Sequence, residues 1–183
     1  MRNDADSIWY RKLFSPNEGT PKRQQLRTSR NQNRNEKLTS LGIWFQTLDR
    51  VYGTLLKNDD FKDYTEEAQI VVFQGIIEDF WQLVKDHSHQ DLFNEPYLYS
   101  IMTSKGVRVL HLALNDIIKA LELEGDFPTK ETMTPFVEDF DYLRVDSDWK
   151  NTKVEKGFLT TFGSANVAYD QFKDNTYLNT CFM

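Results

Sequence analysis

The chain contains a single cysteine, Cys181, among its 183 residues. One thiol cannot form an internal disulfide, and no histidine or second cysteine lies near it in sequence to complete a zinc site. Long apolar runs are also missing, because a transmembrane helix needs about 20 mostly apolar residues. The N-terminal residues MRNDADSIWYRK lack the apolar core of a secretory signal. These features predict a cytosolic protein that has no membrane-spanning segment.

Motifs that would indicate a particular enzymatic reaction are scarce as well. Gly157 and Gly163 do not form a phosphate-binding loop, because the Gly-Lys-Ser/Thr ending of that loop is absent. We interpret both glycines as tight turns or as positions where a helix approaches closely. We therefore expect no cofactor.

Hydrophobic residues (39%) and charged residues (27%) occur in the proportions of a folded protein. Three segments have hydrophobic residues at the i, i+3, i+4, i+7 spacing that places them on one face of a helix. Thr39 or Ser40 can cap the first segment, and Gly125 can end the third. The three predicted helices span residues 40–57, 65–85 and 104–122.

The sequence after the third helix predicts shorter elements. Thr134 followed by Pro135 is typical of a helix cap and a first helical position, so we expect a helix that runs to Phe140 or Tyr142. The prediction places the start of this helix at the proline.

Near the C-terminus, Ser164 is positioned to cap a helix whose inward face carries Val167, Ala168 and Phe172. Residues 97–101 could form one short extended segment. Together, these predicted elements indicate an all-α, single-domain bundle of about five to seven helices.

The net charge of −6 is unevenly distributed. Residues 1–37 contain nine Lys/Arg and four Asp/Glu, a balance of +5, so the remaining residues carry −11. We therefore divide the chain into a basic N-terminal arm (1–37), with a short amphipathic element at residues 7–14, and a helical domain (38–183).

Within the arm, the segment PKRQQLRTSRNQNRNEK has arginines every three or four residues, which a helix would place on one face. Such a face could contact nucleic-acid phosphates. The alternative is a solvated arm that packs against the acidic body of its own chain or of a second subunit. The candidate nucleic-acid-binding residues are Lys22, Arg23, Arg27, Arg30 and Arg34.

Histidines are few, and two of them are close in sequence. His87 and His89 lie next to Asp86 and are candidate metal ligands. The alternative is a polar helix end, where imidazoles are favoured by the helix dipole. His111 could act as a general base, but no serine or cysteine lies at a recognisable spacing from it, and we favour a partly exposed structural histidine.

A polar break precedes the third predicted helix. Thr103, Ser104 and Lys105, followed by Gly106, could expose backbone N–H groups that hold an anion. The simpler interpretation is an ordinary helix cap, with Gly106 allowing a neighbouring helix to approach.

The segment DFWQLVKDHSHQDLFNEPYLYSIMTSKGVRVLHLALNDIIKAL, residues 79–121, resembles the C-terminal helical part of DGQHR-domain proteins. In that family a Phe-Trp helix leads to a Thr-rich turn and then to an apolar helix. Trp149, Gly157 and Gly163 are similar to its closing segment, and SIWYRKLF and the helix from Ser40 lie where its middle section would.

This resemblance implies a relationship to ParB-like proteins of bacterial DNA modification and phage defence, including the repressor-like component of DNA phosphorothioation. The Asp-Gly-Gln-His-Arg motif and the N-terminal half that holds it have no counterpart here, so none of its functional residues can be transferred.

The leading hypothesis is a non-enzymatic helical interaction or regulatory module in a bacterial or phage DNA-modification or defence setting. Its partner would be a protein or DNA, and the chain could also form a homo-oligomer. One alternative is an enzyme or metal-binding protein that uses Asp86, His87, His89 and His111. Another is an acidic DNA mimic, motivated by the −11 balance after residue 37.

Overall fold

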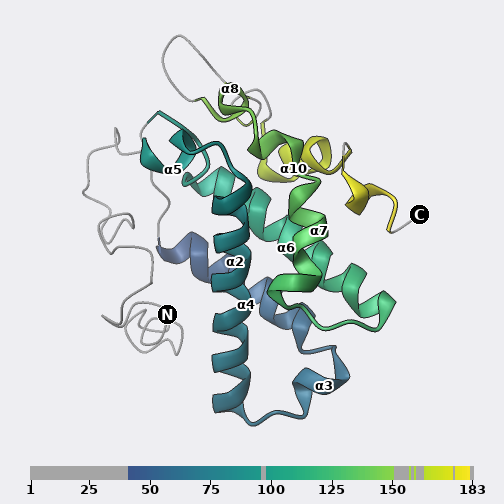
Figure 1. Cartoon of the computed structure of the whole chain (residues 1–183). Helices are drawn as coiled ribbons and strands as arrows, with labels where there is room; N and C mark the ends of the chain where they lie inside the picture. Colours follow the sequence, from purple (N-terminus) through teal and green to yellow (C-terminus); the bar gives the residue numbers. More distant parts are fainter. Residues whose placement is uncertain are drawn as a thin grey trace.

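The computed structural model describes residues 41–95, 98–150, 157, 159, 163–174 and 176–181. These residues form an all-α bundle, as the sequence predicts (Figure 1). None of the described helices is long and apolar enough to cross a membrane. The described elements are, in chain order, α2 (Leu41–Leu55), α3 (Asp59–Lys62), α4 (Glu66–His87), α5 (Asp91–Asn94), α6 (Ser104–Glu124), α7 (Lys130–Glu138), the 3-10 helix η3 (Asp141–Leu143), α8 (Asp146–Trp149), α10 (Ala165–Asp174) and the 3-10 helix η4 (Tyr177–Asn179).

Helix α6 lies at the centre of the bundle. Its N-terminus is capped by Thr103, whose hydroxyl accepts a hydrogen bond from the Gly106 N–H, and it ends at Gly125 in the left-handed conformation (φ 80°). Helices α2 and α10 pack against it. The predicted apolar face is buried as expected, and so are the positions beside it, because neighbours cover several sides. Its buried residues are Gly106, Val107, Val109, Leu110, His111, Ala113, Leu114, Asn115, Ile117, Ile118, Ala120 and Leu121.

Helix α7 corrects one prediction. It begins at Lys130, and Pro135 lies inside it. The true cap is Thr129, which forms a capping box with Thr132, so two backbone N–H groups are satisfied by side chains. Thr134 donates its hydroxyl hydrogen to the Lys130 carbonyl (2.7 Å) and caps nothing. The capping box therefore sets the start of the helix at Lys130, more than one turn before the proline.

Helix α10 begins as predicted, because the Val167 N–H donates to the Ser164 hydroxyl (3.2 Å). Its inward face is partly different from the prediction. Ala168 and Phe172 are buried, but Val167 is 48% exposed and Tyr169 takes the buried position. A phenol hydroxyl can be buried when it finds a hydrogen-bond partner, and Tyr169 has one in the site below.

The predicted extended segment is a single antiparallel bridge between Tyr99 and Lys150. The Ser100 N–H also donates to the Trp149 carbonyl (2.7 Å). This segment folds back tightly on the start of α6, where a Cβ atom on Gly106 would collide with the Ser100 carbonyl oxygen. The glycine is therefore needed for the chain's own preceding turn, and the predicted approach of a neighbouring helix is wrong.

Candidate functional site

At the end of α4, the candidate metal ligands His87 and His89 and the neighbouring Asp86 have separate partners. His87 Nε2 lies 4.0 Å from Glu138, and His89 Nδ1 lies 3.6 Å from Asp91. Asp86 accepts a hydrogen bond from Gln82 and pairs with Lys130, and all of these contacts are on or near the surface. His87 is the last residue of α4, where the helix dipole favours an imidazole.

His111 is not part of this group. It lies beside Trp81, and six residues of helix, about 9 Å along the axis, separate Trp81 from His87. Within the part of the chain that the structure describes, no group of three or more His, Cys, Asp or Glu residues is placed to hold a metal ion. The structure therefore does not bring His111 together with Asp86, His87 and His89 in one site, as the enzyme or metal-binding hypothesis requires.

The polar break before α6 is occupied by structural contacts. Thr103 accepts from the Gly106 N–H (3.2 Å) and donates to the Ser100 carbonyl (2.6 Å). Lys105 donates to the Leu159 carbonyl (2.7 Å). The interpretation as an ordinary cap is confirmed for Thr103. Anion binding at Thr103, Ser104 and Lys105 stays a prediction.

The predicted nucleic-acid-binding residues lie outside the described residues. The same is true of the amphipathic element at residues 7–14 and of the caps Thr39 and Ser40. These residues and segments stay predictions from the sequence. The predicted nucleic-acid-binding residues among them are Lys22, Arg23, Arg27, Arg30 and Arg34.

His111 is fully enclosed, which corrects the prediction of a partly exposed side chain. It is 2% exposed, and its ring forms a triangular cluster with the rings of Trp44 (centroids 4.9 Å apart) and Trp81 (5.7 Å), which are 5.2 Å from each other. Burial lowers the pKa of His111 from 6.5 to about 3, so the imidazole is neutral at physiological pH. The prediction failed because α6 is covered on the sides flanking its main apolar face.

The hydrogen bonds of His111 define its tautomer. The indole N–H of Trp81 can only donate, so it gives its hydrogen to His111 Nε2 (3.1 Å). The neutral ring then carries its own hydrogen on Nδ1 and donates it to the Thr47 hydroxyl (2.6 Å). The Thr47 hydroxyl in turn donates a hydrogen bond to the backbone carbonyl of Ile43 or Trp44. The basic nitrogen thus faces an indole N–H, which leaves it no lone pair for a substrate proton.

Two further polar contacts join other helices to α6. Thr54 on α2 donates to the Asn115 side-chain oxygen (2.6 Å), and both residues are buried. On α10, the Tyr169 hydroxyl donates to Asp116 (2.8 Å), which also pairs with Lys119 (2.8 Å). Burial acts to raise the pKa of Asp116, but the hydrogen bonds and positive charges around it outweigh this effect and lower it.

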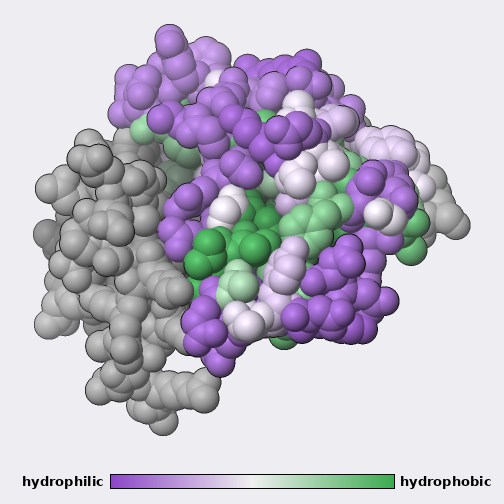
Figure 2. All heavy atoms as spheres, turned by 60° about the horizontal axis from the view of Figure 1, so that its bottom comes forward, coloured by the Kyte–Doolittle hydropathy of each residue, from purple (hydrophilic) through white to green (hydrophobic). Residues whose placement is uncertain are grey.

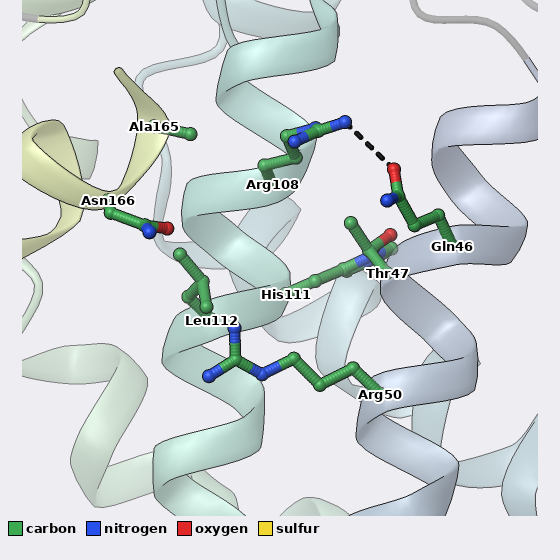
Figure 3. A pocket seen from close by; sticks show the side chains of 8 residues that line it. All are labelled: Gln46, Thr47, Arg50, Arg108, His111, Leu112, Ala165 and Asn166. Carbon is green, nitrogen blue, oxygen red and sulfur yellow. Dashed lines mark hydrogen bonds between the residues drawn. The ribbon is translucent and has the colours of Figure 1, made fainter.

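A pocket of about 200 Å³ lies between α2, α6 and the start of α10 (Figure 3). It contains two arginines, Arg50 from α2 and Arg108 from α6, and no carboxylate among the described residues that line it. Arg108 donates to the Gln46 side-chain oxygen (2.9 Å) at one side of the pocket. The lining residues are Gln46, Thr47, Arg50, Arg108, His111, Leu112, Ala165 and Asn166.

Sequence reasoning did not find this pocket. Gln46 and Arg108 are 62 residues apart in the chain, and Asn166 comes from a third segment. Each arginine alone is an ordinary polar residue on an amphipathic helix, so no local pattern marks the pair.

Hydrophobic side chains also reach the surface. Figure 2, in which the lower end of Figure 1 comes forward, shows a hydrophobic area bordered by hydrophilic residues. Large exposed hydrophobic residues of the α2 to α4 region are Leu56 (39%), Tyr64 (44%) and Val71 (61%).

The chain was compared with protein-family models, with curated proteins and with solved structures, and none of the three comparisons gives a match.

Proposed function

We propose that the protein is a non-enzymatic helical module that binds DNA through its basic N-terminal segment, in a bacterial or phage DNA-modification or defence setting. The observation that carries this proposal is the charge partition of +5 in residues 1–37 against −11 in the rest. The acidic body would be repelled by DNA, so the basic segment is the part suited to attract it. The resemblance to DGQHR-domain proteins supports DNA over other polyanions.

The helix that follows the basic segment supports this role. Trp44, Leu48 and Leu55 of α2 are buried in the core, and α2 is hydrogen-bonded to α6 through Thr47 and Thr54. The basic segment is therefore joined to a firmly packed helix. The partners of His111 support the non-enzymatic part of the proposal, because both ring nitrogens serve the fold.

The test is DNA binding by the full chain, measured by fluorescence anisotropy over a series of salt concentrations. If the five basic residues each contact one phosphate, the logarithm of the binding constant falls with the logarithm of salt concentration with a slope of about −4 to −5. Changing four arginines to glutamine should remove most of this slope. The four are Arg23, Arg27, Arg30 and Arg34.

The matched control changes four exposed basic residues of the helical domain to glutamine: Lys57, Lys62, Lys85 and Arg144. This variant loses the same formal charge and should bind as well as the unmodified chain or more weakly by a small factor. The proposal fails if no complex forms at low salt, or if both variants bind equally.

A further inference from the structure

The pocket between α2, α6 and α10 brings together two basic side chains that have no carboxylate partner among the described residues. Several basic side chains of the described residues pair with nearby carboxylates, as Lys130 does with Asp86 (3.7 Å) and Arg144 with Asp141 (3.6 Å). In the pocket, Arg108 has only the neutral Gln46 amide as a hydrogen-bond partner. Among the described residues, Arg50 has neither a hydrogen-bond acceptor nor a carboxylate partner. The pocket thus holds two unneutralised positive charges in an acidic domain.

The two arginines approach the pocket from different sides. In Figure 3, Arg108 lies on the side of Gln46, whereas Arg50 extends from α2 beneath Leu112. His111 lies between them and is neutral, so it adds no charge of its own. Its hydrogen bonds to Thr47 and Trp81 hold this wall of the pocket in place.

The start of α10 forms a third side. Ser164 accepts a hydrogen bond from the Val167 N–H, which leaves the N–H groups of Ala165 and Asn166 as the first donors of the helix. Both residues line the pocket. In Figure 3 the Asn166 side-chain amide also points toward the pocket, so side-chain donors from α2, α6 and α10 line it.

We infer that this pocket binds a phosphate group. A tetrahedral phosphate has oxygens pointing in several directions, so it can accept from donors on three sides, whereas a carboxylate has two oxygens in one plane. The volume of about 200 Å³ suits a small anion, because pockets for drug-sized ligands are roughly 300–1,000 Å³. The residues that form this site do not include any of the basic segment.

The experiment titrates the full chain with inorganic phosphate at constant ionic strength and follows tryptophan fluorescence and the heat of binding. Trp44 and Trp81 contact His111 in the pocket wall, so occupancy should change their emission. We expect saturable binding. Because hydrogen bonds to charged groups are the strong ones, Arg50→Gln or Arg108→Gln should weaken binding by roughly tenfold or more.

The matched control is Arg144→Gln, which removes an arginine that pairs with Asp141 on η3 and should leave phosphate binding unchanged. Circular dichroism checks that each variant is folded. Ribose 5-phosphate and a short single-stranded oligonucleotide distinguish a free phosphate ester from a nucleic-acid backbone as the source of the group.

The inference is overturned if phosphate gives no saturable signal, if succinate binds while phosphate does not, or if both pocket variants bind as the unmodified chain does. The variant with Arg23, Arg27, Arg30 and Arg34 changed to glutamine should bind inorganic phosphate normally. Its behaviour separates failure of this site from failure of DNA binding by the basic segment.

Discussion

Acidification from about pH 8 to about pH 5 should destabilise the protein through His111. The ring is enclosed by Trp44 and Trp81, and burial lowers its pKa from 6.5 to about 3. In the unfolded chain the imidazole takes up a proton as the pH falls below 6.5, while in the folded protein it does not. The stabilisation is therefore complete above pH 6.5 and is lost progressively as the pH approaches 3.

The magnitude follows from the two pKa values. Each pH unit between them changes the free energy of unfolding by about 1.4 kcal/mol, so the fall from 6.5 to 5 removes about 2 kcal/mol. For a chain of this size, a loss of about 2 kcal/mol lowers the melting temperature by roughly 4–8 °C. This range lies above the pKa of ordinary carboxyl groups, so they contribute little to the change.

The assay is urea unfolding at the two pH values, with the unmodified protein, His111→Gln and the control His89→Gln. Glutamine can still accept from Trp81 and donate to Thr47, but it does not titrate. We expect His111→Gln to lose about 2 kcal/mol less than the unmodified protein on acidification. His89 is a more exposed residue with a surface carboxylate partner, and its variant should keep most of the pH dependence. Equal losses in the unmodified protein and His111→Gln would refute the reasoning.

Three further predictions concern packing and one hydrogen bond, and the stability changes are checked by thermal unfolding at neutral pH. Gly106→Ala should destabilise the protein by at least about 2 kcal/mol, because the added Cβ would collide with backbone atoms that cannot move away. In the control Gly75→Ala, the added Cβ has no atom within 4 Å, so this variant should be more stable by up to about 1 kcal/mol. Tyr169→Phe should cost about 1 kcal/mol and raise the pKa of Asp116, which an NMR titration measures. Phe172→Ala should cost about 3–5 kcal/mol, and a loss below about 1 kcal/mol would contradict its complete burial.

The sequence is sufficient to predict the helical class and the long helices, because the signals for both are local. The apolar spacing of residues 104–122, together with Thr103 before them and Gly125 after them, anticipates α6 to within two residues at its C-terminus. Pro135 misled the prediction because two local signals competed, and the capping box of Thr129 outweighed the preference of proline for a first helical position.

The candidate site was not predictable in the same way. One helix shows which of its faces is apolar, but it does not show how many neighbours surround it. His111 was therefore expected to be partly exposed, although α2 and α4 enclose it. The pocket of Arg50 and Arg108 depends on contacts between segments far apart in the chain, and neither arginine differs locally from a solvated one.

The polar contacts between α2 and α6 also fix the axial register of the two helices. Apolar side chains can exchange neighbours when one helix slides along another, but a hydroxyl that donates to a buried amide has only one matching position. A slide of one turn would separate Thr47 from His111 and Thr54 from Asn115 at once. Because Arg50 belongs to one of these helices and Arg108 to the other, the same two contacts set the spacing of the guanidinium groups.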